Sequence, residues 1–201
     1  MTRVVLASLN RAKAREIAQI LATEGLQAEI VSLSEFPAAT LPPETGCTFR
    51  QNALLKARAA AQATGLPALA DDSGLEVDAL GGAPGVLSAR YAGEGASDED
   101  RFRRILARLR GVPEGERTAR FRCAAVYAEP GGQAVTAEGA IEGHIAAAAR
   151  GTGGFGYDPV FIPQGHHRTM AELTPAEKHA LSHRGRAFRA LAALLRRRLA
   201  D

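Results

Sequence analysis

Long apolar runs are absent from this chain of 201 residues. None approaches the roughly 20 residues that a membrane-spanning helix needs. The opening stretch, MTRVVLASLN, also holds too few apolar side chains for a signal peptide. Cysteine is rare as well, since Cys47 and Cys123 lie far apart and form no C-x-x-C pair. These absences make a reduced, cytoplasmic protein without membrane contact the default expectation.

Lysine and asparagine are scarce. Of the 25 Lys and Arg residues, only Lys13, Lys56 and Lys178 are lysines, and the only asparagines are Asn10 and Asn52. Because lysine is a compact point charge on a thin stem, we interpret these positions as places where a planar guanidinium does not fit. The alternative is that they are scattered at random. The net charge of +3 is small for a nucleic-acid-binding protein.

The apolar pattern predicts one α/β domain with a mixed sheet over residues 1–201. Asn10 and Thr48 are expected to cap two helices, and Gly65 to end the second. The segment LPALADDSGLEV, residues 66–77, predicts two strands separated by an acidic turn. Residues 174–177 predict a further capping box. The other predicted strands are 4–8, 28–33, 117–129, 133–145 and 159–162, and Pro130-Gly131-Gly132 is expected to join the two long ones as a hairpin. The predicted helices are 10–25, 48–65, 98–110 and about 186–199.

Two segments combine the scarce residue types. SLNRAK, residues 8–13, leaves a predicted strand and opens a helix, where N–H groups and partial positive charge suit a phosphate. Ser8 and Asn10 add donors, whereas Lys13 opposes the helix dipole unless an anion is present. An ordinary helix cap with a surface lysine is an equal alternative. In NALLK, Asn52 and Lys56 lie four residues apart on one helix face.

The segment ADDSG places two carboxylates, Asp71 and Asp72, next to each other. Adjacent carboxylates repel unless a cation is present. Mg²⁺ would suit them, because it is often bound by one or two carboxylates together with substrate phosphates. Glu44 is a further carboxylate in the loop before the second helix. A simple turn is an equal alternative, because Asp, Ser and Gly favour turns.

Four glycines occupy six positions at the start of GTGGFGYDPVF, residues 151–161. They would let backbone amides approach a flat ligand closely, with Phe155 or Tyr157 placing a ring against a base. Asp158 precedes a proline, which favours an extended backbone. A turn that enters a strand is the alternative.

Cationic side chains gather again in EKHALSHRG, residues 177–185, which holds Lys178, His183 and Arg184. The nearby histidines show no zinc-site spacing, so we expect no zinc. Sites for a phosphate, a metal and a base together point to a nucleotide substrate.

The chain resembles the inosine/xanthosine triphosphate pyrophosphatase family in five motifs, which occur in the order SLNRAKAREI, TFRQNALLKA, ADDSGLEVDALGGAPGVLSARYAG, GTGGFGYDPVF and AELTPAEKHALSHRG. The resemblance implies an elongated mixed sheet flanked by helices, in two lobes with an active-site cleft between them. It further implies a cytoplasmic homodimer that uses Mg²⁺ and hydrolyses non-standard purine nucleoside triphosphates (ITP, dITP, XTP) to the monophosphate and pyrophosphate.

The resemblance also implies roles for individual residues. Leu9 departs from the family pattern, since relatives commonly have a small residue there, and His166 and His167 receive no role. The implied phosphate contacts are Ser8, Asn10, Lys13 and Lys56; the metal ligands are Glu44 and Asp72, with Asp72 also the catalytic proton acceptor; Ser73 contacts the substrate; and Phe155, Gly156, Tyr157, Asp158, Lys178, His183 and Arg184 hold the base and sugar.

Two other classes of protein stay open at this point. A nucleotide-binding regulator without turnover would keep the cationic residues but would not need the paired carboxylates. A nucleic-acid-binding protein would use the arginines, and its affinity would fall steeply with salt. Release of pyrophosphate from ITP distinguishes the three classes.

Overall fold

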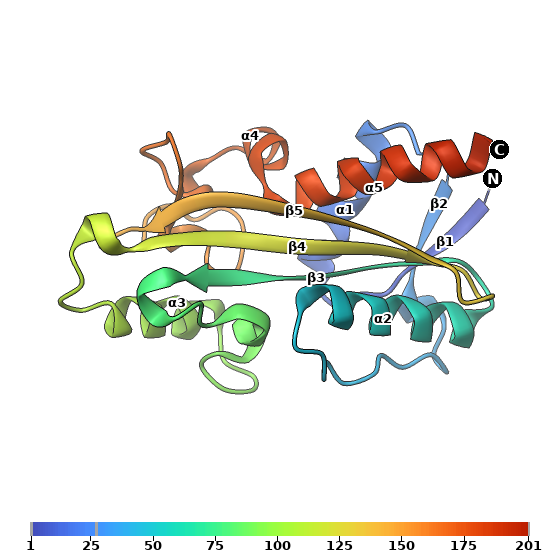
Figure 1. Ribbon diagram of the computed structural model, residues 1–201, viewed down its shortest axis with the longest axis horizontal. Helices are drawn as coiled ribbons and strands as arrows, with labels where there is room; N and C mark the ends of the chain where they lie inside the picture. Colours follow the sequence, from blue (N-terminus) through green and yellow to red (C-terminus); the bar gives the residue numbers. More distant parts are fainter. Residues whose placement is uncertain (1, 27, 201) are drawn as a thin grey trace. The chain divides into compact units, whose positions relative to one another are not determined.

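The computed structural model describes residues 2–26 and 28–200. Within them, six strands form one sheet in the order β2-β1-β3-β4-β5-β6 (Figure 1). β1 pairs in parallel with β2 and β3, whereas β5 and β6 are antiparallel, so the mixed sheet expected from the sequence is confirmed. The strands are β1 (Thr2–Leu6), β2 (Ala28–Ser32), β3 (Ala68–Val77), β4 (Thr118–Ala128), β5 (Ala134–Ile145) and β6 (Phe161–Pro163).

The predicted helix ends are confirmed where local signals define them. The side chain of Asn10 accepts a hydrogen bond from the Lys13 amide at the start of α1. Thr48 and Gln51 form a reciprocal capping box before α2, which ends at Gly65 with a φ of 67°. Glycine enters this left-handed region without steric cost. The helices are α1 (Arg11–Thr23), α2 (Phe49–Thr64), α3 (Asp98–Arg108), α4 (Pro175–Leu181) and α5 (His183–Ala200).

The chain divides into two compact units. Unit 1 holds Met1–Asp72, Cys123–Gly139 and Arg184–Asp201, and unit 2 holds Ser73–Arg122 and Ala140–His183. The long strands β3, β4 and β5 therefore contribute residues to both units. The active-site cleft expected from the resemblance stays a prediction. In the described residues, no helix is both long enough and apolar enough to cross a membrane.

Unit 1 has an apolar core between the sheet and two helices. Ile17 and Leu21 of α1 and Phe188 and Leu191 of α5 belong to one buried cluster with side chains of β1, β3 and β4. Figure 1 shows α5 and α2 on opposite sides of these strands. Residues that face α5 from the sheet therefore lie on the opposite side from residues that face α2.

Unit 2 has a core of its own. Ile105 of α3 packs with Leu75 of β3, Phe121 of β4 and Phe161 of β6, and each of these side chains is buried. Thr174 caps α4 through the expected capping box, with Pro175 as its first residue.

Three sequence predictions about the elements are wrong. Asp158 begins a short 3-10 helix, Asp158–Val160, and not an extended segment, so the strand that was expected from residue 159 begins only at Phe161. β3 runs without interruption from Ala68 to Val77, so the acidic turn expected at Asp71 and Asp72 is absent. Turn propensity is weak compared with strand pairing and with the ion pairs that these carboxylates make, which are described below. The last helix begins at His183 and not near residue 186. Ser182 precedes it, and serine is among the residues favoured at a helix start.

Candidate active site

Asp71 and Asp72 point to opposite sides of β3, because side chains alternate along a strand. Asp71 faces α1 and α5. Its Oδ2 lies 3.1 Å from Lys13 Nζ and 3.3 Å from Arg184 Nε. Burial alone would raise the pKa of Asp71, but the charges of Lys13 and Arg184 lower it well below its usual value. Asp71 is thus the anion that offsets the unfavourable position of Lys13 in the first turn of α1.

Arg184 is held by two carboxylates. Its NH1 lies 2.7 Å from Glu16 Oε2, and its side chain is only 3% exposed. Cys123 also lies against this cluster, with its Sγ 3.8 Å from Asp71 Oδ2. The sequence predicted Arg184 as a contact to base and sugar; in the structure its observed partners are Glu16 and Asp71, and the predicted contact stays a prediction.

Asp72 faces α2 and meets a different set of residues. Lys56 Nζ lies 3.1 Å from Asp72 Oδ1 and 2.6 Å from Glu44 Oε1, so one ammonium joins both carboxylates. Asn52 Nδ2 donates to Asp72 Oδ2 at 3.1 Å, and Asn52 Oδ1 accepts from the Gly46 amide at 2.7 Å. Asn52 therefore ties the loop that carries Glu44 to the strand that carries Asp72.

The pKa values of both Asp72 and Lys56 are raised in this cluster, but for different reasons. Burial raises the pKa of Asp72, and the nearby charge of Glu44 raises it further, against the lowering effect of Lys56. For Lys56, burial lowers the pKa, but Asp72 and the other carboxylates outweigh it and the net shift is upward. Lys56 therefore stays charged, while Asp72 is a stronger proton acceptor than an ordinary aspartate.

The residues predicted to bind a metal fit Mg²⁺ in their chemistry. Glu44 and Asp72 offer carboxylate oxygens to the same cation, at present the ammonium of Lys56. In the part of the chain that the structure describes, no group of three or more His, Cys, Asp or Glu side chains could hold a metal. Two carboxylates with further ligands from phosphates and water are a usual set for Mg²⁺.

A second group of predicted residues meets within unit 2. Lys178 Nζ lies 2.7 Å from Asp158 Oδ2 and 4.5 Å from the centre of the Phe155 ring. The Phe155 amide donates to the same Asp158 oxygen at 2.9 Å. His183 is buried and stacks on Phe121, with ring centres 4.8 Å apart. The glycine-rich segment and α4 therefore share one electrostatic cluster.

Tyr157 lies in the core of unit 2. It is 4% exposed, and its hydroxyl donates to the Ser88 carbonyl at 2.7 Å. Phe155 is only half-buried and presents the more accessible of the two rings. The predicted contact of Tyr157 with a substrate stays a prediction.

The turn before α1 belongs to the segment that the sequence predicted to bind phosphate, residues 8–13. The Ser8 amide donates to the Leu6 carbonyl at 2.9 Å, and the Asn10 amide donates to Ser8 Oγ at 3.3 Å. Two amides of the turn are thus used within it. Leu9 is 75% exposed. Ser73 is half-buried and directly follows Asp72 in β3.

All three lysines contact carboxylates from these motifs. The side chains of Lys13, Lys56 and Lys178 are 16%, 8% and 9% exposed, respectively. The rarity of lysine thus pointed to buried charge clusters. Burial alone does not select lysine over arginine, however, since Arg184 is equally buried.

Some residues of these clusters were not predicted as site residues. Asn52 had a signal, namely its spacing of four residues from Lys56. Glu16 had none, because one glutamate in an amphipathic helix is ordinary. Asp71 could have been predicted from its position next to Asp72. That the two carboxylates have different partners follows only from the alternation of side chains along β3.

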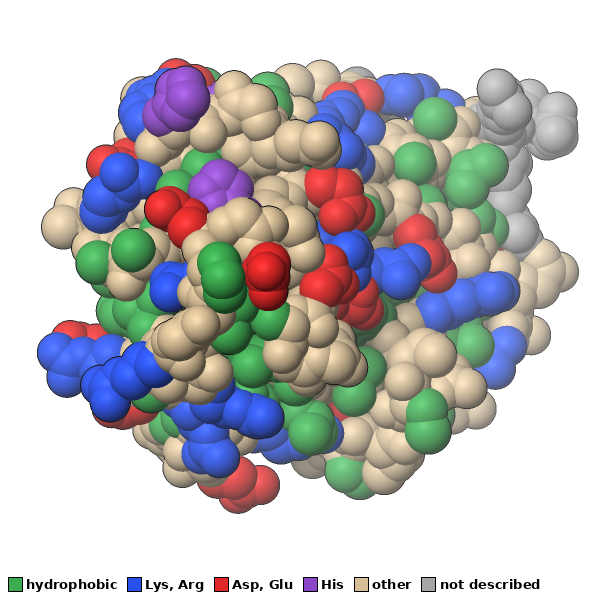
Figure 2. Space-filling view, turned by 60° about the vertical axis from the view of Figure 1, so that its left-hand side comes forward, with side chains coloured by type: hydrophobic (Ala, Val, Ile, Leu, Met, Phe, Trp, Pro, Cys, Tyr) green, Lys and Arg blue, Asp and Glu red, His purple; other side chains and the backbone are tan. Residues whose placement is uncertain are grey.

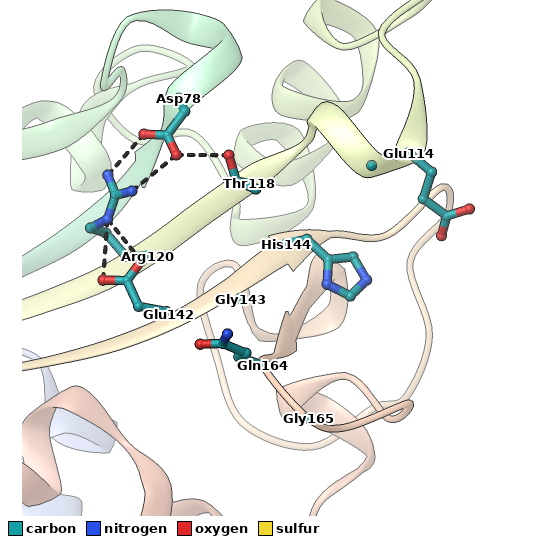
Figure 3. A pocket seen from close by; sticks show the side chains of 10 residues that line it. Asp78, Glu114, Thr118, Arg120, Glu142, Gly143, His144, Gln164 and Gly165 are labelled. Carbon is teal, nitrogen blue, oxygen red and sulfur yellow. Dashed lines mark hydrogen bonds and ion pairs between the residues drawn. The ribbon is translucent and has the colours of Figure 1, made fainter.

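A cavity of about 640 Å³ in unit 2 lies apart from the predicted residues. Figure 3 shows Arg120 in its wall, with hydrogen bonds to Asp78 and Glu142. Thr118 donates to the same Asp78 carboxylate at 2.7 Å. Arg120, Asp78 and Glu142 in this wall are thus bonded to one another. On the face in Figure 2, Asp and Glu side chains lie among the Lys and Arg side chains, so that this face shows no unbroken basic stripe.

Comparison with known proteins decides the family. The Ham1 family model matches residues 4–194. The chain belongs to the Ham1 family. The resemblance seen in the motifs is therefore confirmed. Among similar proteins, a dITP/XTP pyrophosphatase of Streptomyces coelicolor is 50% identical over 196 residues, 98% of each chain. One of Geobacter sulfurreducens is 54% identical over 188 residues, 94% of each chain.

Solved structures agree with the fold of this Ham1 chain. A HAM1 protein from Coxiella burnetii has a TM-score of 0.89 and 44% identity, and the match covers 98% of this chain and 100% of that one. The Staphylococcus aureus Ham1 protein has a TM-score of 0.85 and 38% identity, with 97% of this chain and 98% of that one covered.

Proposed function

We propose that this chain is a pyrophosphohydrolase of non-standard purine nucleoside triphosphates. It converts ITP, dITP or XTP and one water into the nucleoside monophosphate and pyrophosphate, and so removes these nucleotides from the pool. Its similarity to proteins named dITP/XTP pyrophosphatase, over almost the whole chain, supports this proposal.

The observation that carries the proposal is the meeting of Glu44, Lys56 and Asp72. They come from a loop, a helix and a strand, and Lys56 Nζ lies within 3.1 Å of both carboxylates. Burying three charges costs desolvation free energy that ion pairing often fails to recover. A fold gains little from such a cluster, whereas an enzyme that handles a triphosphate needs buried cationic and anionic groups side by side.

Asp72 is proposed as the proton acceptor for the attacking water. Its raised pKa, caused by burial and by Glu44, suits this role. Asn52 holds one Asp72 oxygen and so orients the carboxylate. Lys13 and Lys56 are proposed to stabilise the negative charge that develops on the departing pyrophosphate. Ser8 and Asn10 are proposed as further contacts to the phosphates, and Ser73 as a contact to the substrate.

Glu44 and Asp72 are proposed to hold Mg²⁺, which when bound would neutralise charge on the triphosphate. The convergence of both carboxylates on one cation supports this proposal.

Selection for a 6-keto purine is assigned to the unit 2 cluster, with His183 and Arg184 as further proposed contacts. The Phe155 ring is proposed to stack on the base, together with the backbone at Gly156. An ammonium has three donors, and Asp158 accepts one from Lys178. Another can pair with O6 of the base, whereas the 6-amino group of adenine is itself a donor. An unpaired buried donor costs about 1–3 kcal/mol, so one lost pairing lowers affinity by about fivefold to a hundredfold.

We propose further that residues 1–201 form one functional domain, and that the protein is a cytoplasmic homodimer. Sedimentation of the purified protein measures the oligomeric state directly.

The test of the proposed function is incubation of the purified protein with ITP, dITP, XTP, ATP and GTP in the presence of Mg²⁺. Monophosphate and pyrophosphate should appear in equal amounts from the first three, and far more slowly from ATP and GTP. Guanine also carries O6, so slow turnover of GTP requires a further element near the 2-position of the base. Nucleotide binding without turnover would support a regulator, and salt-sensitive binding of DNA or RNA alone would support a nucleic-acid-binding protein.

A further inference from the structure

Two consecutive amides of the glycine-rich segment donate to carboxylates from different parts of unit 2. The Phe155 amide donates to Asp158, three residues further along the chain. The Gly156 amide donates to Asp98 Oδ2 at 2.7 Å, and Asp98 is the first residue of α3, 58 positions earlier. The second contact ties the segment to an element that none of the sequence motifs included.

Asp98 is held in place from its own helix. Its other oxygen, Oδ1, accepts from Arg101 NH1 at 2.6 Å, and Arg101 NH2 donates to the Ala96 carbonyl at 2.7 Å. Both carboxylate oxygens are therefore in use, and a carboxylate in the first turn of a helix is favoured by the helix dipole. The contact with Arg101 therefore holds the Asp98 carboxylate in position independently of its hydrogen bond to Gly156.

The contact constrains the backbone next to the Phe155 ring. Gly156 has a φ of 66°, a conformation that L side chains rarely adopt. Its amide belongs to the peptide bond that follows Phe155, so fixing this amide limits rotation about the Phe155 backbone. The Phe155 ring itself lies against Lys178. The residue that follows Gly156, Tyr157, is held by the hydrogen bond that its hydroxyl donates to the Ser88 carbonyl.

We propose that Asp98 is a positioning residue for recognition of the substrate base. Its hydrogen bond to the Gly156 amide sets the orientation of the Phe155 ring against which the base stacks. The proposal rests on the proposed function. Because the contact is made before the substrate reacts, its loss weakens binding of substrate and transition state alike, which raises KM and leaves kcat nearly unchanged.

The test compares Asp98→Ala with Asp100→Ala. Both residues are acidic and lie in the first turn of α3, but Asp100 bonds to Ser97 and not to the glycine-rich segment. Both variants lose one negative charge near the same helix end together with the hydrogen bonds of that side chain, so both melting temperatures should fall. The KM for ITP should rise about tenfold in Asp98→Ala, equivalent to about 1.4 kcal/mol, and less than twofold in Asp100→Ala. Asp98→Asn keeps an oxygen acceptor and should recover part of the loss.

A second measurement does not depend on activity. Hydrogen exchange at the Gly156 amide should be faster in Asp98→Ala than in the original protein, and unchanged in Asp100→Ala. Equal exchange at Gly156 in both variants, or an unchanged KM in Asp98→Ala, overturns the proposal. A fall in kcat that matches the fall in kcat/KM also overturns it. The two proposals can fail separately. If the unmutated protein releases no pyrophosphate, the proposed function is contradicted, and with it the role of Asp98 in base recognition. Hydrogen exchange at the Gly156 amide would still establish the contact between Asp98 and Gly156.

Discussion

Replacing Lys56 by methionine removes the ammonium that joins Glu44 and Asp72. The side chains of Lys56 and Asp72 are each 8% exposed, and that of Glu44 is 25% exposed. Removing one partner of a buried ion pair leaves an uncompensated charge and costs about 3–5 kcal/mol. We expect Lys56→Met to lower the free energy of unfolding by an amount in this range.

Lys13→Met is the matched control, because it makes the same chemical change on the opposite side of β3. Asp71 loses Lys13 but keeps Arg184, whose Nε lies 3.3 Å away. The loss is then one charged hydrogen bond, about 1.5–3 kcal/mol. Lys13→Met should therefore destabilise the protein less than Lys56→Met.

The assay is unfolding by urea, with the midpoint and slope compared among the three proteins. Mg²⁺ should stabilise Lys56→Met more than it stabilises the original protein, since a cation near Glu44 and Asp72 replaces the lost ammonium. The reasoning would be refuted by a Lys13→Met variant as unstable as Lys56→Met, or by a loss of less than about 1 kcal/mol in Lys56→Met.

The remaining predictions concern activity, the glycine-rich segment and acid stability. Asp72→Asn should lose most of its turnover but still bind nucleotide, and a near-normal kcat would remove Asp72 from the chemistry. Lys178→Arg should raise the KM for ITP, because a planar fork replaces a compact charge beside Asp158; normal kinetics would show that any cation suffices. Gly156→Ala should raise this KM and cost at most about 1–2 kcal/mol of stability, as measured by unfolding; a larger stability loss with unchanged KM would assign the glycine to folding. Hydrogen bonds from Arg120, then Thr118, lower the pKa of Asp78, so Arg120→Met should be less stable than the original protein at pH 7, and this difference should shrink as pH falls below about 4. A difference that stays constant with pH would contradict that cause.

Local signals in the sequence predicted much of the fold. The caps at Asn10 and Thr48 and the stop at Gly65 involve residues within a few positions of each other, and all appear in the structure. The hairpin of β4 and β5 follows from two alternating segments on either side of a short Pro-Gly-Gly turn. Such contacts depend on neighbouring residues alone, so one sequence is enough to predict them.

The partners of the site residues depend on distant parts of the chain. Arg184 meets Asp71 across 113 positions and Glu16 across 168. No spacing rule connects residues so far apart. The same limit explains the error at ADDSG: Asp, Ser and Gly favour a turn locally, but sheet pairing and the separate ion pairs of Asp71 and Asp72 keep β3 extended.

The glycine-rich segment shows where local and distant causes combine. The sequence predicted that its glycines allow close approach to a base. In the structure, a Cβ at Gly151 would lie 2.6 Å from the Ala171 backbone, and one at Gly154 would collide with the Asp158 carboxylate. That carboxylate binds both Lys178 and the Phe155 amide. A side chain at residue 154 would therefore displace the group that positions Lys178 and Phe155. Gly154 serves the proposed base site by making room for Asp158, whereas Gly156 has open space around it and is required for its positive φ.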